Sequence, residues 1–193
     1  MSHTAIRLSG LLLISGATLL AAAILRLSFK PVMDQIFSPG ISLLLLLASI
    51  LLLLSLPGMY AKQSEAAGWL GLVGHGLLQA GLILIVVVAA APLLYPSIRE
   101  APGESLVAFA LGIALTFGLL LTGMATLRAG VYPRWSGPLL LAATVGFFFD
   151  FFIAEFLPPI AGQVGSAAFG VLLALALAGV GYSALTNPAL TRR

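Results

Sequence analysis

Residues 35–61 read QIFSPGISLLLLLASILLLLSLPGMYA and carry no charged side chain. This stretch is longer than the roughly 20 apolar residues that a helix needs to cross the hydrocarbon of a membrane. Polar and apolar residues do not alternate along it, as they would in a strand of a membrane-spanning barrel. The stretch therefore predicts a membrane-spanning helix at about residues 38–60.

The rest of the chain has the same character. Of its 193 residues, 61% are apolar and only 8% are charged, whereas a soluble domain has about a quarter of its residues charged. Further uncharged stretches cover residues 8–25, 66–98, 105–127, 135–149 and 156–191. We therefore expect an all-α membrane protein, with one transmembrane domain over residues 1–193. The six predicted spans are approximately 5–28, 38–60, 68–95, 104–128, 136–157 and 161–186.

Turns marked by proline recur along the chain at intervals of roughly 60 residues, a period typical of tandem structural repeats. The three turns are Pro31-Val32-Met33, Pro96-Ser97-Ile98 and Pro158-Pro159-Ile160. Each turn lies between two predicted spans, so the recurrence predicts three tandem helical hairpins. Their expected bounds are about 5–60, 68–128 and 136–186. We expect the first span to be retained rather than cleaved as a signal peptide, because it matches the fifth span in this repeat.

The distribution of basic residues predicts the orientation in the membrane, because short cytoplasmic loops are enriched in lysine and arginine. With both termini in the cytoplasm, six basic residues fall on that side and three on the opposite side. The six are Arg7, Lys62, Arg128, Arg134, Arg192 and Arg193, and the three are Arg26, Lys30 and Arg99. We therefore expect both termini to be cytoplasmic.

Several functional classes find no support in the sequence. The net charge of +3 is spread among the loops, without the basic block that nucleic-acid binding requires. Cysteine is absent, and the two histidines are far apart in sequence, so no metal site is predicted. The motifs of serine hydrolases, zinc proteases and phosphate-binding loops are also absent. We therefore expect a protein that is not an enzyme and that has no resident cofactor.

Asp150 lies within the run Phe147-Phe148-Phe149-Asp150-Phe151-Phe152 of the fifth predicted span. A carboxylate at that depth costs a few kcal/mol, so it should face protein or water rather than lipid. The repeat places Arg26 at a similar depth, which predicts a buried ion pair between the two side chains. The alternatives are a role for Asp150 in proton or ion transport, or a contact with a lipid or cofactor.

Glu155 follows Asp150 by five residues, roughly 140° around the helix. The two carboxylates therefore do not share a face, and a paired acid–base site is not predicted. Glu155 is expected near the lipid headgroups and is an alternative partner for Arg26.

His75 and Gln79 lie one helical turn apart in the third predicted span, with Gly74 and Gly76 beside the imidazole. Polar side chains flanked by glycines commonly form hydrogen bonds between membrane helices. His75 is also a candidate ligand for a cofactor, since a flat macrocycle needs such a ligand and such clearance. Contact with a small ligand is the third alternative.

Small residues recur every four positions along the sixth predicted span, at Ser166, Gly170, Ala174 and Ala178. Such a ridge lets two helix backbones approach closely. We expect it to pack inside the bundle, and the alternative is a seam between copies in a homo-oligomer.

Two short segments resemble turns in small, uncharacterised multi-pass proteins of bacterial inner membranes. They are Tyr132-Pro133-Arg134-Trp135-Ser136-Gly137 and Leu56-Pro57-Gly58-Met59-Tyr60. The resemblance implies a location in the bacterial inner membrane and implies no activity.

Three functional hypotheses follow from these features. The first is a non-catalytic membrane protein, either a scaffold or accessory subunit of a larger complex or a binder of small ligands. The second is a small transporter or channel for a proton, an ion or an apolar solute, with Asp150 as its protonatable group and Arg26 as the counter-ion. An intramembrane enzyme is the third.

Overall fold

The computed structural model describes residues 3–28, 38–94, 104–153, 156 and 159–187. The described residues form helices and no strand, which confirms the all-α class. The elements are α1 (His3–Ser28), α2 (Pro39–Leu94), α3 (Glu104–Ala129), α4 (Ser136–Phe148), the π-helix η2 (Phe149–Ile153) and α5 (Pro159–Thr186). Five helical segments, one of them formed by α4 and η2 together, are long and apolar enough to cross a membrane. The helices are therefore compatible with the membrane class predicted from composition.

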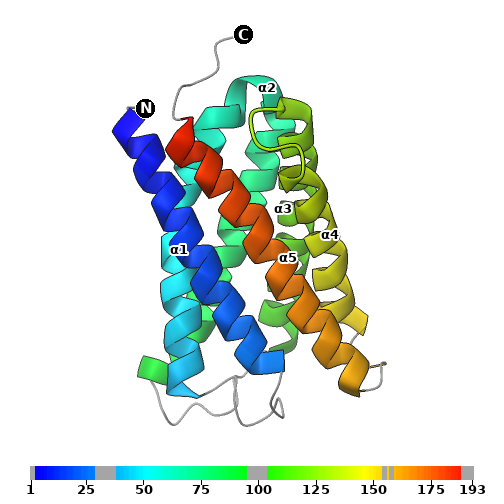
Figure 1. Cartoon of the computed structure of the whole chain (residues 1–193). Helices are drawn as coiled ribbons and strands as arrows, with labels where there is room; N and C mark the ends of the chain where they lie inside the picture. The colour runs from blue at the N-terminus through cyan, green and yellow to red at the C-terminus, as the bar shows by residue number, and fades with distance from the viewer. Residues whose placement is uncertain (1–2, 29–37, 95–103, 154–155, 157–158, 188–193) are drawn as a thin grey trace.

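The six separate helices expected from the sequence are not confirmed, because two of the predicted spans lie in the single element α2. At Gly68, α2 has the non-helical angles φ 58° and ψ −144°, a conformation that is nearly exclusive to glycine. Figure 1 shows the chain folding back at this point, so that residues 39–67 and 69–94 form two antiparallel arms. We call this bend the elbow.

The polar segment 61–67 was expected to be a loop between two spans, and it is helical instead. It contains three alanines, which favour helix, and its Lys62 and Gln63 are buried against other parts of the bundle. The contacts of Lys62 and Gln63 thus stabilise the helical conformation up to Gly68, where the backbone turns.

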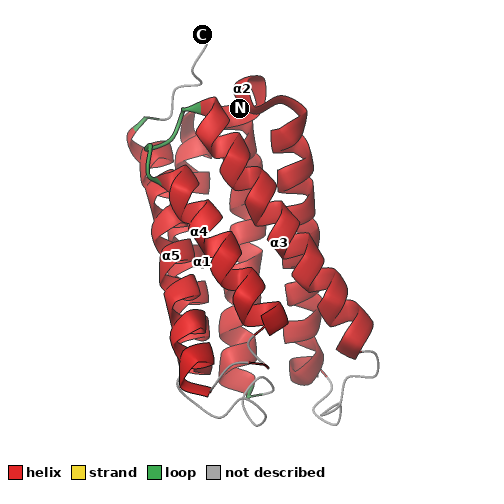
Figure 2. Cartoon of the chain, turned by 90° about the vertical axis from the view of Figure 1, so that its right-hand side faces the viewer, coloured by secondary structure: helices red, strands yellow, loops and turns green. Residues whose placement is uncertain are grey.

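The helices form a closed ring (Figures 1 and 2). Helix α2 packs against α1 and α3, helix α4 packs against α3 and α5, and α5 packs back against α1. The first helix begins and the last helix ends at the elbow end of the bundle (Figure 1). The three-hairpin repeat is not confirmed, because α2 joins two of the expected hairpins and η2 is the only π-helix among the described residues. The first two proline turns that marked the repeat lie outside the described residues, as does Pro158 of the third, whereas Pro159 and Ile160 of that third turn begin α5.

Close contact between α1 and α5 closes the ring near the elbow end. A Cβ atom on Gly10 would lie 2.6 Å from the carbonyl oxygen of Gly181, and a Cβ atom on Gly181 would lie 2.7 Å from that of Gly10. Only glycine fits where two backbones approach so closely. Further along α5, Gly170 packs against the side chain of Ile24 of α1.

Candidate functional site

A chamber of about 900 Å³ lies inside the ring of helices, and all of the elements contribute to its wall. On α1 it runs from Leu13 to Ser28, the last residue of that helix. The wall therefore extends from mid-bundle to the end opposite the elbow. The other apolar side chains of the wall are Leu20, Ile24, Leu27, Leu45, Leu52, Leu56, Leu78, Leu82, Ile85, Val88, Ala89, Leu111, Leu115, Leu119, Phe147, Phe151, Phe169, Leu173 and Leu177.

The polar side chains of this wall gather toward the end opposite the elbow. They are Ser28 of α1, Asp150 of η2, and Gln163 and Ser166 of α5. The Ser28 hydroxyl donates a hydrogen bond to the carbonyl oxygen of Ile24 in its own helix, at 2.8 Å. Asp150 is thus the ionisable side chain that the described residues present to the chamber.

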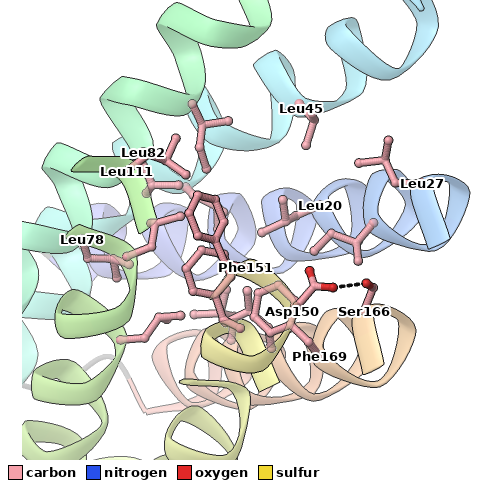
Figure 3. A pocket seen from close by; sticks show the side chains of 18 of the residues that line it. Leu20, Leu27, Leu45, Leu78, Leu82, Leu111, Asp150, Phe151, Ser166 and Phe169 are labelled. Atoms are coloured by element: carbon pink, nitrogen blue, oxygen red, sulfur yellow. Dashed lines mark hydrogen bonds between the residues drawn. The ribbon is translucent and has the colours of Figure 1, made fainter. Parts of the chain in front are cut away.

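The carboxylate of Asp150 accepts a hydrogen bond from the hydroxyl of Ser166 (Figure 3). The same hydroxyl lies 3.1 Å from the carbonyl oxygen of Gly162. A serine has one hydroxyl hydrogen, so Ser166 can donate to one of these two oxygens at a time. Ser166, predicted as part of a packing ridge, is therefore a direct partner of Asp150.

A local change of helix type positions Asp150. Helix α4 ends at Phe148, and Phe149–Ile153 continue as the π-helix η2. Short π-helical segments occur frequently at functional sites. Sequence reasoning assumed α-helical spacing through this region and missed η2.

Three phenylalanine rings line the chamber with Asp150. The ring centroids of Phe147 and Phe151 are 5.4 Å apart, and those of Phe147 and Phe169 are 5.3 Å apart. Figure 3 shows Phe151 and Phe169 on either side of Asp150. A Cβ atom on Gly112 of α3 would meet the ring of Phe151, so this glycine leaves room for the aromatic side chain.

The structure does not bring Arg26 and Asp150 together. Arg26 is exposed, whereas its neighbour Ile24 faces the chamber. Two residues correspond to roughly 200° around a helix, so Arg26 lies on the opposite face of α1. Glu155, the alternative partner of Arg26, lies outside the described residues.

The other predicted polar residue, His75, belongs to a hydrogen-bonded group near the elbow. Its Nδ1 lies 2.8 Å from the carbonyl oxygen of Gly71, and its Nε2 lies 3.3 Å from the amide nitrogen of Gln63. In turn, the hydroxyl of Thr126 donates to the amide oxygen of Gln63 at 3.4 Å. These bonds are consistent when Nδ1 carries the ring proton and donates it to Gly71.

Lys62 continues this group toward the end of α5. Its ammonium group donates to the carbonyl oxygen and to the hydroxyl of Ser183, both at 3.0 Å, and lies 5.2 Å from the centroid of the Tyr132 ring. A cation is favourable there because the last turn of a helix carries partial negative charge. Burial raises the pKa of Tyr132 above its ordinary value, so its hydroxyl stays protonated and donates to the carbonyl oxygen of Met59 at 2.8 Å.

We call this group the elbow cluster. It consists of Lys62, Gln63, His75, Thr126, Tyr132 and Ser183. Sequence reasoning found only His75, because Lys62 and Gln63 were assigned to a loop. Gln79, predicted beside His75, is half-buried and has no hydrogen-bond partner within the described part of the chain.

The two groups differ in what they can do chemically. Both ring nitrogens of His75 hold hydrogen bonds, and the side chain is 3% exposed, which leaves no nitrogen for a cofactor. Within the described ranges, no three histidine, aspartate or glutamate side chains lie close enough to hold a metal ion. The chamber, in contrast, has the size and apolar lining of a ligand site. Comparison with models of protein families, with curated proteins and with solved structures finds no match to this chain, so a functional assignment rests on the chamber itself.

Proposed function

We propose that this chain is a non-catalytic membrane protein that binds an apolar small molecule in its central chamber. The observation that carries the proposal is the chamber of about 900 Å³, whose described lining is mostly leucine, valine and phenylalanine and includes one ionisable side chain, Asp150. Ligand sites have volumes of about 300–1,000 Å³, apolar walls and few polar groups. The chamber has all three properties.

The proposed setting is the bacterial inner membrane, crossed six times, with both termini in the cytoplasm. The 56 residues of α2 would span about 84 Å as a straight helix, far more than the roughly 30 Å of hydrocarbon. Its two arms are therefore proposed as two crossings. Trp69, Trp135 and Tyr182 are exposed toward the elbow end, where an aromatic belt would lie at the cytoplasmic boundary.

A binding role fits the chemistry of the chamber better than catalysis. Acyl or phosphoryl transfer needs a base near the nucleophile. Ser166 is bonded to the carboxylate of Asp150, but the described residues of the chamber wall include no histidine or lysine to act beside this pair. The chamber thus offers recognition without a second reactive group.

Transport of a small solute through the membrane is the second candidate function. The favouring observation is that Asp150 lines the chamber instead of pairing with Arg26. Flux in proteoliposomes, compared at several pH values between the wild type and Asp150→Asn, tests it. Equal flux at matched insertion would remove Asp150 from such a mechanism.

Binding is tested with Nile red, a neutral apolar dye that becomes fluorescent in apolar surroundings, on protein in neutral detergent. Ala89 lines the chamber, whereas Ala80 of the same arm is exposed on the outer face. We expect Ala89→Trp to fill the chamber and weaken dye binding by about tenfold or more, and Ala80→Trp to leave it unchanged, because filled volume excludes the ligand. Equal binding by both variants would place the dye on the outer surface and overturn the proposal.

A further inference from the structure

We infer that the chamber selects a long-chain amphiphile whose head is a protonated amine bound by Asp150. This inference rests on the proposed binding function and adds the chemical class of the ligand. In a membrane, a ligand of the chamber must be distinguished from the surrounding lipid. An apolar molecule gains little when it moves from lipid tails to an apolar chamber, so the polar groups of the wall must provide the selectivity.

The charge of the wall favours a cation. Among the described residues that line the chamber, Asp150 is the one ionisable side chain. Two basic residues of the described ranges lie elsewhere, since Arg26 is exposed on the other face of α1 and Lys62 is bonded to Ser183 at the elbow end. A carboxylate in apolar surroundings is strongly stabilised by a cation that also forms hydrogen bonds with it.

The carboxylate can accept such bonds. An ionised carboxyl group offers about four acceptor positions, and Ser166 uses one of them. An alkylammonium head donates up to three hydrogen bonds. A fatty-acid head would instead bring a second negative charge next to Asp150.

The aromatic rings beside Asp150 point to the same ligand. Phe147, Phe151 and Phe169 line the chamber together with the carboxylate, and Figure 3 shows Phe151 and Phe169 near Asp150. The faces of aromatic rings attract cations, and groups of aromatic side chains bind ammonium ligands in this way. Neutral alcohols gain much less from such rings.

The length of the chamber indicates that the ligand has a long alkyl chain. On α5 the wall runs from Gly162 to Leu177, with Ser166 near one end. The 11 residues from Ser166 to Leu177 span about 16 Å at 1.5 Å per residue. A head bound at Asp150 therefore leaves a long apolar passage toward the elbow, lined by leucines, for a single extended chain.

The test is competition with bound Nile red by hexadecylamine, hexadecanol and palmitate at neutral pH, where the amine is protonated. The three compounds share one chain and differ only in the head. We expect hexadecylamine to bind about tenfold more tightly than hexadecanol, and palmitate to bind most weakly, because charge-assisted hydrogen bonds are the stronger ones. The Ala89→Trp variant gives the background from binding to the micelle.

Asp150→Asn should reduce the preference for the amine over the alcohol to less than about threefold, with both competitors measured against the Nile red affinity of that variant. The amide keeps an oxygen that can accept from Ser166 and loses the charge. Glu65→Gln is the matched control, because it removes an exposed negative charge on α2 away from the chamber wall. Phe169→Leu provides a second variant, with an expected two- to threefold loss of amine preference from the missing ring, roughly 0.5 kcal/mol.

Each outcome of this competition decides the inference. Equal displacement by amine and alcohol in the wild type, or an unchanged preference in Asp150→Asn, would overturn it while the binding function stands. Absence of Nile red binding in the wild type would instead overturn the binding function. Adding lysophosphatidylethanolamine, which has one acyl chain, as a further competitor distinguishes two sources of the amine. Displacement by it indicates a membrane lipid, and displacement by hexadecylamine alone indicates a free amine.

Discussion

The elbow cluster and the Asp150 end of the chamber both place polar side chains inside an apolar bundle, at opposite ends. At the elbow, Gln63 is bonded to His75 and to Thr126, so α2 and α3 are joined through side chains. At the other end, Asp150 is bonded to the hydroxyl of Ser166 and faces the chamber. Groups that satisfy one another stabilise the fold. A carboxylate with spare acceptor capacity is suited to a ligand.

The backbone also differs between the two ends. At the elbow, the bend at Gly68 is followed by tight contacts, and Lys62 bonds the last turn of α5. Around Asp150, the α-helix gives way to the five residues of η2. The elbow end is thus expected to determine stability, and the Asp150 end to determine ligand choice. Three substitutions test this division.

The largest expected effect is on the α1–α5 contact near the elbow. Gly181→Leu places a side chain against the carbonyl oxygen of Gly10, 2.7 Å from the new Cβ, so the two helices must separate. We expect the free energy of unfolding to fall by about 3 kcal/mol. Thermal and denaturant unfolding in one detergent measures it.

Gly165→Leu is the matched control for this substitution, because a Cβ on Gly165 of the same helix meets no atom within 4 Å. It should be neutral or slightly stabilising, since leucine favours helix more than glycine does. An equal loss in both variants would show that the ring does not depend on close contact at Gly10 and Gly181.

The second effect concerns the hydrogen bonds of the elbow cluster. Gln63→Leu leaves the Nε2 atom of His75 and the hydroxyl of Thr126 without their partner, in a region where Gln63 is 0% exposed. We expect a loss of about 2 kcal/mol in unfolding free energy, because buried polar groups are costly when unpaired. The Gln79 side chain is half-buried and lies outside the cluster, so Gln79→Leu should change the unfolding free energy by less than about 0.5 kcal/mol. The reverse order would contradict the assignment of the cluster as structural.

The sequence was sufficient to predict the parts of this fold that depend on composition. Long uncharged stretches of leucine and alanine can be accommodated only as helices in lipid, and the positions of most helices follow from them. The elbow could not be predicted, because Lys62 and Gln63 look like loop residues until Ser183 and His75 are placed beside them. Those contacts join residues that are 121 and 12 positions apart.

The site was predictable only in part. The cost of a charge in a membrane identified Asp150, and the repeat then suggested Arg26 as its partner from depth alone. Depth does not determine the face of a helix, and Arg26 lies on the outer face of α1. The chamber itself arises from the packing of all the elements, so no local pattern of residues reveals it.

The smallest expected effect on stability is therefore at Asp150 itself. A buried ion pair that loses one partner costs about 3–5 kcal/mol, whereas Asp150→Asn keeps an oxygen for the hydroxyl of Ser166 and removes a charge from an apolar wall. We expect Asp150→Asn and Arg26→Gln each to change the unfolding free energy by less than about 0.5 kcal/mol. The double variant should show no coupling between them, since sites that share no contact are additive. A coupling of about 2 kcal/mol or more would mean that the two charges pair, and would make the Asp150 end structural like the elbow. Near-zero coupling, together with a loss of amine preference in Asp150→Asn, would support the division of roles. The elbow end would then determine stability, and the Asp150 end would determine ligand choice.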